Sequence, residues 1–424
     1  MRKFALYVAL AVVVTLPSFY LRLSGTPAAP PFQAAIFFAA ILAAGFMLSW
    51  GAEAAEKHVS QGLTIGLLAL ITVLPEYAVD LYYTYQAGLH PTSAYAGFAA
   101  ANMTGANRLL VGVGWPLIVL LHRWYNGKRD VELHRDNSAE IAYLGLASLY
   151  AFVIVAKNRI DLLDCGILAA IFAAYLWRLG KLPKAEEAEA DEEVGPAAAL
   201  ATLPSAWQWT IMAVLTVMAV AVILTVAEPF AESLLATGRQ WGVSQFMLVQ
   251  WVAPLASETP GVVLVLLFVL KQRPTASLST LVSDKINQWT LLVGMIPLAY
   301  ALGAGRVQHF ELDARQHEEF FLTAAQSLFA VGLLLHLRLT LRSALLLLGL
   351  FGGQFALAWV YQHDEPRTVL VLTYVGWGYL VLAAGLFWSR RAVLGQHIRE
   401  GLLARMPPPE PADGPRPAPG RDIT

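Results

Sequence analysis

The sequence contains one cysteine and few charged residues. Cys165 alone allows neither an intrachain disulfide nor a cysteine cluster that holds a metal ion. Lys, Arg, Asp and Glu make up 14% of the 424 residues, and the formal net charge is -1. Such a balance offers no basic surface for nucleic acid. We therefore predict that the chain has no nucleic-acid partner.

Motifs of known enzyme classes are also missing. The chain has no nucleophile elbow, no HExxH zinc motif and no candidate cysteine nucleophile. All nine histidines lie near the ends of predicted helices, in loops or in the tail. These absences argue against an integral-membrane enzyme that acts on lipid or peptide. We expect neither catalytic activity nor a bound cofactor.

Apolar residues, by contrast, are abundant. They make up 57% of the chain, and the mean hydropathy is +0.56, which is typical of a polytopic membrane protein embedded in the lipid bilayer. Long apolar runs predict an all-α fold with about twelve transmembrane helices. These runs span residues 4–21, 33–57, 61–87, 94–121, 138–157, 160–180, 207–236, 243–270, 277–303, 316–336, 339–361 and 367–389.

Composition shifts divide the chain into segments. We predict a peripheral first helix in 1–32, a first half in 33–180, an acidic linker in 181–206, a second half in 207–361, a peripheral last helix in 362–390 and a proline-rich tail in 391–424. The first run has no good signal-peptidase site, so we interpret it as a retained helix. The segments predicted on the same side of the membrane as the N-terminus hold twice as many Lys and Arg residues as the loops on the other side. Because Lys and Arg are enriched in cytoplasmic loops, this predicts cytoplasmic N- and C-termini and a cytoplasmic linker.

Two similar stretches lie within the apolar runs. LITVLPEYAVD contains Glu76 and VAPLASETPGVV contains Glu258, and 33 residues after each glutamate comes the tetrad Leu-Leu-Val-Gly. The predicted topology gives the two stretches opposite directions across the bilayer. Inverted repeats of this kind are typical of secondary transporters, whose substrate site lies where the repeats meet. We place the repeat motifs at 61–121 and 243–303.

A carboxylate at membrane depth is costly unless it is paired, protonated or bound to a cation. Prolines beside the two glutamates support the last two possibilities. Pro75 would free the carbonyl of Ile71, while Pro254 and Pro260 bracket Glu258. Freed backbone carbonyls are oxygen ligands suited to hard cations such as Ca²⁺ or Na⁺. A simple proline kink is the alternative interpretation.

Further polar residues surround the two glutamates. Thr72 and Asp80 lie one helical turn on either side of Glu76, and Ser257 precedes Glu258. When the two Leu-Leu-Val-Gly tetrads are superposed, Asn102 on the following helix of the first repeat corresponds to Asp284 in the second. We therefore predict a cation site. Its residues are Glu76, Glu258, Asp284, Asn102, Asp80, Thr72 and Ser257.

At these residues the sequence resembles the sodium/calcium exchanger family of the calcium/cation antiporter superfamily. Members carry a T-S-L-P-E-like stretch and a following G-S-N-containing helix in each of two inverted repeats. Here the stretches read TVLPE (72–76) and PLASE (254–258), followed by ANMTGANRLLVG and SDKINQWTLLVG. The resemblance implies that Glu76 and Glu258 are the central cation ligands and that Thr72 occupies a ligand position. Asn102 and Asp284 fall where the family has the Ser of G-S-N.

The chain also departs from the family pattern. The family's next polar ligand falls on Ala106 and Gln288, and Arg108 and Lys285 are foreign to the pattern. Lys285 follows Asp284, so its ammonium could neutralise a carboxylate that an ion would otherwise occupy. Either cation could instead form a salt bridge that only stabilises helix packing.

The prediction is a divergent prokaryotic-type antiporter in the bacterial inner membrane. It would exchange Ca²⁺ for Na⁺ or H⁺ by alternating access, with inorganic cations as its partners. Because both ions would need the same carboxylates, their binding would be mutually exclusive. Two alternatives remain at this point: a monovalent Na⁺/H⁺ antiporter on the same scaffold, and a membrane scaffold or sensor that carries no ion flux.

Overall fold

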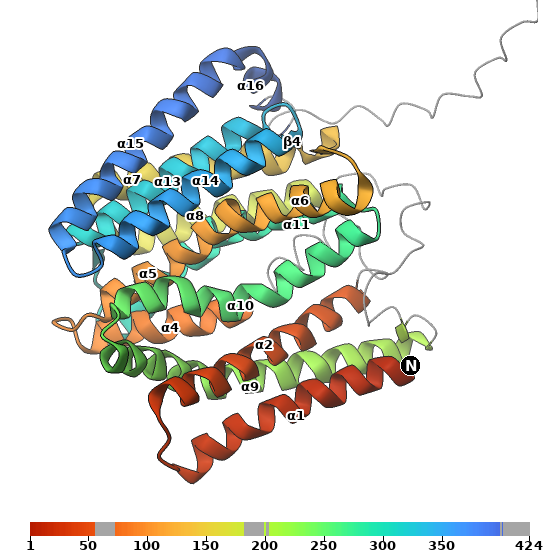
Figure 1. Ribbon diagram of the computed structural model, residues 1–424, viewed down its shortest axis with the longest axis vertical. Coiled ribbons are helices and arrows are strands. Elements are labelled where there is room, and N and C mark those ends of the chain that lie inside the picture. Colours follow the sequence, from red (N-terminus) through yellow and green to blue (C-terminus); the bar gives the residue numbers. More distant parts are fainter. Residues whose placement is uncertain (56–72, 182–198, 201–202, 399–400, 402–424) are drawn as a thin grey trace, which may run out of the picture.

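The computed structural model describes residues 1–55, 73–181, 199–200, 203–398 and 401, and most of them are helical. The helices lie side by side with their axes roughly along one direction (Figure 1). The first half contains α1 (Arg2–Ser24), α2 (Pro30–Ala55), α4 (Leu74–Leu89), α5 (Tyr95–Leu109), η2 (Leu110–Gly114), α6 (Trp115–Asn126), η3 (Arg135–Asn137), α7 (Ser138–Lys157) and α8 (Leu162–Leu179).

The second half has a matching order of elements. It contains α9 (Ser205–Trp241), α10 (Gln245–Leu270), α11 (Pro274–Asn287), η5 (Gln288–Leu292), α12 (Val293–Ala304), α13 (Ala314–Leu334), α14 (Leu341–Val360), α15 (Glu365–Ser389) and α16 (Arg391–Ile398). In both halves a five-residue π-helical segment, η2 or η5, joins two α-helices into one longer rod. Such segments are rare and often mark functional sites.

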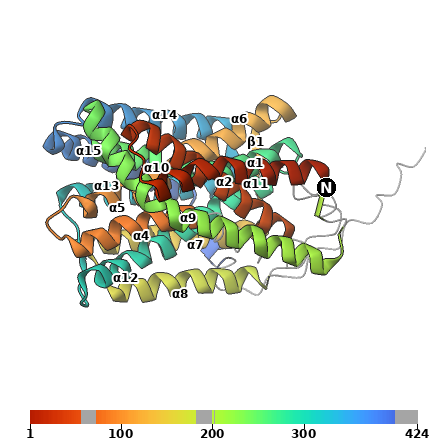
Figure 2. The same ribbon diagram turned by 90° about the horizontal axis from the view of Figure 1, so that it is seen from below.

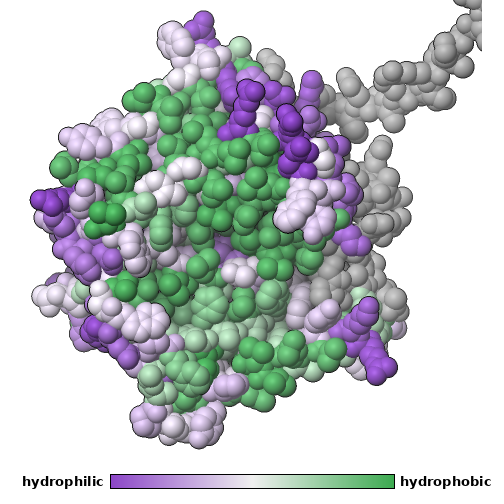
Figure 3. All heavy atoms as spheres, in the orientation of Figure 1, coloured by the Kyte–Doolittle hydropathy of each residue, from purple (hydrophilic) through white to green (hydrophobic). Residues whose placement is uncertain are grey.

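The surface confirms a polytopic membrane protein. In the described residues, ten helical segments are long and apolar enough to span a bilayer. Large apolar side chains on the outer helices are exposed, including Leu224 (69%) on α9 and Val381 (70%) on α15. Figure 3 shows a broad hydrophobic band with polar side chains gathered towards its edges. Contact with lipid chains explains this exposure.

The predicted total of twelve spans stays a prediction. The helix expected at 61–87 lies partly outside the described residues, which resume before α4. The helix expected at 316–336 exists as α13, but it is almost entirely buried and carries Arg315, Glu318 and Glu319 in its first two turns. Its charged residues lower its hydropathy below that of the other spans. The helix tolerates them because it is surrounded by protein and not by lipid.

Two short strand pairs reveal the inverted repeat. β1 (Asp130–Glu132) pairs with β4 (Arg338–Thr340), and β2 (Arg159–Ile160) pairs with β3 (Phe310–Glu311). β1 and β2 flank α7, which is 20 residues or about 30 Å long, so the two pairs lie at opposite ends of the helices. β3 and β4 flank α13 in the same way. Because β1 pairs with β4, α7 and α13 run antiparallel, as equivalent helices of inverted repeats must.

Helix packing follows the same symmetry. The long helices α2 and α9 pack against each other, α2 also contacts α10, and α9 contacts α4. α8 packs on α12 as α14 packs on α6, and Figure 2 shows α8 and α14 at opposite faces of the molecule. α1 packs on α2, and α15 packs on α13, at the outside of this arrangement. The centre therefore consists of α4, α5, α10 and α11 with the two π segments.

Close approach of α4 and α12 requires glycine at two positions. A Cβ at Gly88 would lie 2.2 Å from the carbonyl oxygen of Tyr300, and a Cβ at Gly303 would lie 2.1 Å from that of Tyr85. Both distances are far below van der Waals contact with backbone atoms that cannot move independently. Small residues at such crossings let membrane helices approach closely.

We predict that Gly303→Ala lowers the free energy of unfolding by about 1–3 kcal/mol, because the new methyl group forces α4 and α12 apart. Gly378 on α15 is the matched control, since an added Cβ there meets nothing within 4 Å. Thermal unfolding in detergent should show a clear loss for the first variant and no loss for the second. Equal melting temperatures for both variants would contradict the close crossing.

Candidate functional site

The two predicted glutamates meet in the centre of the molecule. Glu76 lies in the first turn of α4, and Glu258 lies in the middle of α10; they are 0% and 6% exposed. The Nε2 of Gln288, the first residue of η5, donates to Glu76 Oε2 at 3.1 Å and to Glu258 Oε1 at 2.7 Å. One amide group thus joins the two repeats.

Several oxygen atoms at this site have no hydrogen-bond donor. Among the described buried side chains, Glu76 Oε1, Gln288 Oε1, Asp80 Oδ2 and Asn102 Oδ1 are without a partner. Buried oxygens are normally paired, so a group of unpaired ones needs an explanation. A proton or a hard cation is the species that such oxygens bind.

Asp80 and Asn102 form a second polar contact one turn farther along α4. Asn102 Nδ2 donates to Asp80 Oδ1 at 2.7 Å, and both side chains are buried. In the part of the chain that the structure describes, no three His, Cys, Asp or Glu side chains converge on one point. An ion held by Glu76 and Glu258 would therefore draw its other ligands from amides, carbonyls or water. Asp80 lies next to this site without joining the pair.

The other predicted ligands are Ser257, Asp284 and Thr72. Ser257 donates its hydroxyl hydrogen to backbone carbonyls of its own helix, at 3.4 Å from Ala253 O and 3.3 Å from Pro254 O. Asp284 is buried one turn before Gln288. Thr72 and Ile71 lie outside the described residues. Pro75 lies in the first turn of α4, where N–H groups have no acceptor within the helix, so its missing N–H costs no helical hydrogen bond.

The carbonyl that Pro254 frees is not beside the carboxylate pair. Gln250 is eight residues before Glu258, which is about 12 Å along the helix. Its carbonyl oxygen lies against α5, where a Cβ at Gly105 would be only 1.9 Å away. The glycine thus allows α5 to cover this exposed backbone. The prolines inside α10 explain the bend of this helix visible in Figure 1. The Gln250 carbonyl packs against α5 and does not face the carboxylate pair.

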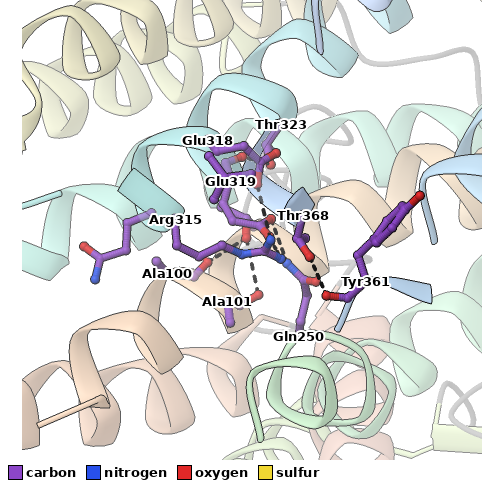
Figure 4. Close-up of polar contacts among 12 residues, drawn as sticks. Ala100, Ala101, Gln250, Arg315, Glu318, Glu319, Thr323, Tyr361 and Thr368 are labelled. Atoms are coloured by element: carbon purple, nitrogen blue, oxygen red, sulfur yellow. Dashed lines mark hydrogen bonds and ion pairs between the residues drawn. The ribbon is translucent and has the colours of Figure 1, made fainter. Parts of the chain in front are cut away.

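Arg108 belongs to a separate buried charge cluster. It pairs with Glu319 of α13, which also accepts from Gln250 Nε2 at 2.7 Å and lies 2.5 Å from Arg315. Figure 4 shows Glu319 beside Gln250 and close to Ala100 and Ala101 of α5. Glu318 is 1% exposed and lies 3.8 Å from Arg315. This charge cluster (Arg108, Arg315, Glu318 and Glu319) connects α5 with α13, and Gln250 links it to α10.

The charge cluster borders a polar cavity of about 780 Å³ at the β3 end of the molecule. Arg315 lines this cavity together with Asp313, Gln316 and Arg306. Water can therefore reach the edge of the cluster from one side of the molecule. The salt-bridge alternative for Arg108 is the correct one, since its guanidinium is bound to Glu319.

Lys285 is buried by a different arrangement. Its Nζ donates to the backbone oxygen of Asn107 at 3.0 Å and to Asn107 Oδ1 at 3.2 Å. The side chain is 0% exposed and its Nζ lies 5.9 Å from the ring centroid of Trp289. Lys285 is one turn before Gln288, and its side chain reaches across to α5 of the other repeat.

Sequence reasoning missed some of the residues that build this site. Gln288 was seen only as a departure from a pattern, although it joins the two glutamates. Tyr77, whose hydroxyl donates to Asn287 Oδ1 at 2.7 Å, binds α4 to α11 beside them. Glu318 and Glu319 could have been found from the sequence. Two acidic residues in a predicted span need cationic partners, and Arg108 is a cation within another predicted span.

An all-α membrane protein whose inverted repeats meet at a buried carboxylate pair has the architecture of a secondary transporter. Comparisons with known proteins agree. The profile of the family described as sodium/calcium exchanger protein matches residues 30–180 and 211–360. The crystal structure of the H⁺/Ca²⁺ exchanger CAX aligns with a TM-score of 0.85 and 35% identity, over 94% of this chain and 97% of that chain.

More distant structures share the fold. A structure of the sodium-calcium exchanger NCX_Mj aligns with a TM-score of 0.53 and 16% identity, over 81% of this chain and 98% of that one. A second NCX_Mj structure aligns with a TM-score of 0.52 and 17% identity, over 77% and 96%. A search among curated proteins finds no match. The chain belongs to the sodium/calcium exchanger family, which is a family of transporters and not of enzymes.

Proposed function

We propose that this protein is a secondary active antiporter that exchanges Ca²⁺ for protons at Glu76 and Glu258. The observation that carries the proposal is that one amide nitrogen, Gln288 Nε2, donates to both buried carboxyl groups, to Glu76 Oε2 at 3.1 Å and to Glu258 Oε1 at 2.7 Å. Two carboxyl groups held this close in a buried site repel each other when both are ionised, so a proton or a cation has to offset their charge. The similarity to a structure described as an H⁺/Ca²⁺ exchanger supports the same coupling ion.

The exchange follows from competition for the same oxygens. In one state, one or both carboxyl groups carry protons and the buried pair has little net charge. In the other, Ca²⁺ binds between the carboxylates after the protons have left, and its charge offsets theirs. Gln288 remains in place in both states and can offer its unpaired Oε1 to the metal ion. Because Ca²⁺ and protons cannot occupy these oxygens together, each crossing carries one or the other.

Alternating access requires moving parts around this site. The two long helices α2 and α9 pack against each other and against the motif helices of the opposite repeats. A shift of this helix pair relative to α4 and α10 would open the site first to one side and then to the other, as in other transporters with inverted repeats. The bundle that contains α7, α8, α13 and α14 would remain as the scaffold.

Ion flux into proteoliposomes tests the proposal. An acid interior should drive ⁴⁵Ca²⁺ uptake by the wild-type protein, and the double variant Glu76→Gln/Glu258→Gln should take up no more than protein-free vesicles. An outward Na⁺ gradient at equal pH on both sides should drive little uptake. Uptake that follows the Na⁺ gradient alone, or Na⁺-driven pH change that is insensitive to Ca²⁺, would contradict proton–calcium exchange.

Competition with protons also predicts the pH dependence of Ca²⁺ binding. As the pH falls, protons occupy the oxygens that Ca²⁺ needs, so binding weakens. We expect the apparent Kd to rise by about tenfold per pH unit for each proton that Ca²⁺ displaces. Calorimetry in buffers of different ionisation enthalpy would measure both the affinity and the number of protons released. A pH-independent Kd with no proton release would rule out a shared site.

The proposed location is a bacterial inner membrane with both termini in the cytoplasm, and with the linker 181–206 on the same side. The segments on the side of the N-terminus together hold more Lys and Arg than the loops on the other side, which supports this orientation. Reporter fusions at the two ends of the chain test it. A fusion that is active only on the cytoplasmic side should function at both termini.

A further inference from the structure

A carboxyl group that the exchange at the glutamate pair does not use is buried at the β1 end of the molecule. Glu140 lies in the first turn of α7 and is 2% exposed. Its Oε1 accepts from the Ser279 hydroxyl at 2.6 Å, and its Oε2 accepts from Asn137 Nδ2 at 2.8 Å. Both donors are uncharged, and Asn137 is partly exposed to solvent. Glu140 therefore lies one residue away from water and can take up a proton without losing either donor.

Ser279 begins a row of three polar side chains along one face of α11. Ser279, Ser283 and Asn287 are four residues apart, so they lie one above the next on the helix, and all three are buried. Each of them bonds to a titratable side chain of a different helix. These contacts are Ser279 with Glu140 of α7, Ser283 with Tyr175 of α8 at 2.5 Å, and Asn287 with Tyr77 of α4 at 2.7 Å.

Other hydroxyl groups of α11 are bonded differently. Ser277 donates to the backbone oxygen of Val265 at 2.7 Å, and Thr280 donates to that of Ala276 at 2.9 Å. A backbone carbonyl is the usual acceptor for a hydroxyl group that serves only helix packing. The α11 row (Ser279, Ser283 and Asn287) connects side chains that can hold or pass a proton, so packing alone does not account for it.

The inner end of the α11 row lies against the glutamate site. Asn287 precedes Gln288, which donates to both glutamates, and Tyr77 follows Glu76. The contact of Tyr77 with Asn287 and the contact of Glu76 with Gln288 therefore join the same two segments of chain. Consecutive members of the row are about 6 Å apart along the helix. One water molecule with two hydrogen bonds of about 2.8 Å each spans this distance.

We propose that Glu140, the α11 row and intervening water form a proton path between the glutamate pair and the β1 end. This inference rests on the proposed exchange function and names the residues that carry its protons. A proton that leaves the pair passes to water beside Tyr77. Each hydroxyl group on the way accepts one proton and gives up its own, and Ser279 passes the last one to the Glu140 carboxylate. Glu140 then releases it to water beside Asn137, so one proton leaves the pair and one enters the solvent.

Exchange of Ca²⁺ for Ca²⁺ separates proton transfer from the other steps of transport. In proteoliposomes at equal pH on both sides, internal unlabelled Ca²⁺ exchanges for external ⁴⁵Ca²⁺ with no net movement of protons. We expect Glu140→Gln and the double variant Ser283→Ala/Tyr175→Phe to slow ⁴⁵Ca²⁺ uptake driven by an acid interior at least tenfold. Both should keep Ca²⁺/Ca²⁺ exchange within twofold of the wild type. Thr280→Val is the matched control, because it removes a hydroxyl group of α11 outside the row, and it should keep both activities.

Three results would overturn the proton-path proposal. They are proton-driven uptake by Glu140→Gln within twofold of the wild type, an equal loss of both kinds of exchange in the variants, and an equal slowing of proton-driven uptake by Thr280→Val. If Glu140→Gln does not fold, the double variant and its control decide by the same criteria. A failure of the exchange function itself would appear separately, as a wild-type protein that shows no ⁴⁵Ca²⁺ uptake driven by an acid interior.

Discussion

Replacing Glu258 by glutamine is expected to reduce Ca²⁺ transport at least about 100-fold, which corresponds to about 3 kcal/mol of lost ion binding. The substitution keeps the shape of the side chain and removes the charge that a buried Ca²⁺ needs. Glu258 is 6% exposed, so water cannot replace the lost ligand easily. Glu76→Gln should have an effect of the same size, because the two carboxyl groups act as one site.

Glu228 provides the control for these substitutions. It is also a glutamate of a membrane helix, but it is half-exposed and pairs with Arg22 on the outside of α9. Exposed pairs contribute little, so Glu228→Gln should transport Ca²⁺ within about twofold of the wild type. Initial rates of ⁴⁵Ca²⁺ uptake at matched protein density give the comparison. If Glu258→Gln retained half of the wild-type rate, the glutamate pair would not be the transport site.

The second large effect concerns stability. Glu319→Gln removes the anion that Arg108, Arg315 and Gln250 share. Among the described residues it leaves Glu318 alone to balance two buried guanidinium groups. Removing one partner of a buried ion pair costs about 3–5 kcal/mol. We expect a large fall in the melting temperature measured in detergent.

Two further variants make this stability test specific. Arg108→Leu combined with Glu319→Leu removes both charges of the buried pair, so the double variant should be more stable than the sum of the two single effects predicts. Arg367→Ala removes an exposed partner of Asp364 and should change stability by less than about 0.5 kcal/mol. Additive effects at Arg108 and Glu319 would show that they are not coupled.

Much of the architecture was predictable because its causes are local. Runs of apolar residues predict membrane helices wherever they occur, and Lys and Arg placement predicts their direction. The two glutamate stretches therefore indicated inverted repeats, and the strand pairing and the family profile confirm these repeats. α13 is the instructive case: its charged first turns belong to a helix surrounded by protein, a situation that hydropathy does not distinguish from an interrupted span.

Partners of buried polar groups were less predictable. Arg108 and Lys285 are both cations within predicted spans. From the sequence, each could either form a salt bridge or lie in the ion site. Arg108 lies 211 residues from Glu319, and Lys285 lies 178 residues from Asn107. Nothing in the local sequence selects between such distant partners. The partners are set by how the helices of the two repeats align with each other where they pack.

The sequence by itself determined an all-α membrane protein with two similar stretches of opposite direction, each with a buried glutamate. Hydropathy and charge act on each segment separately, so these properties do not depend on how the helices pack. Tertiary structure alone decided that Gln288 joins the two glutamates, that Arg108 pairs with Glu319 and that Lys285 binds carbonyl oxygens. The physical reason is that a buried polar group must find its partner across a helix interface, and only packing brings the two sides together.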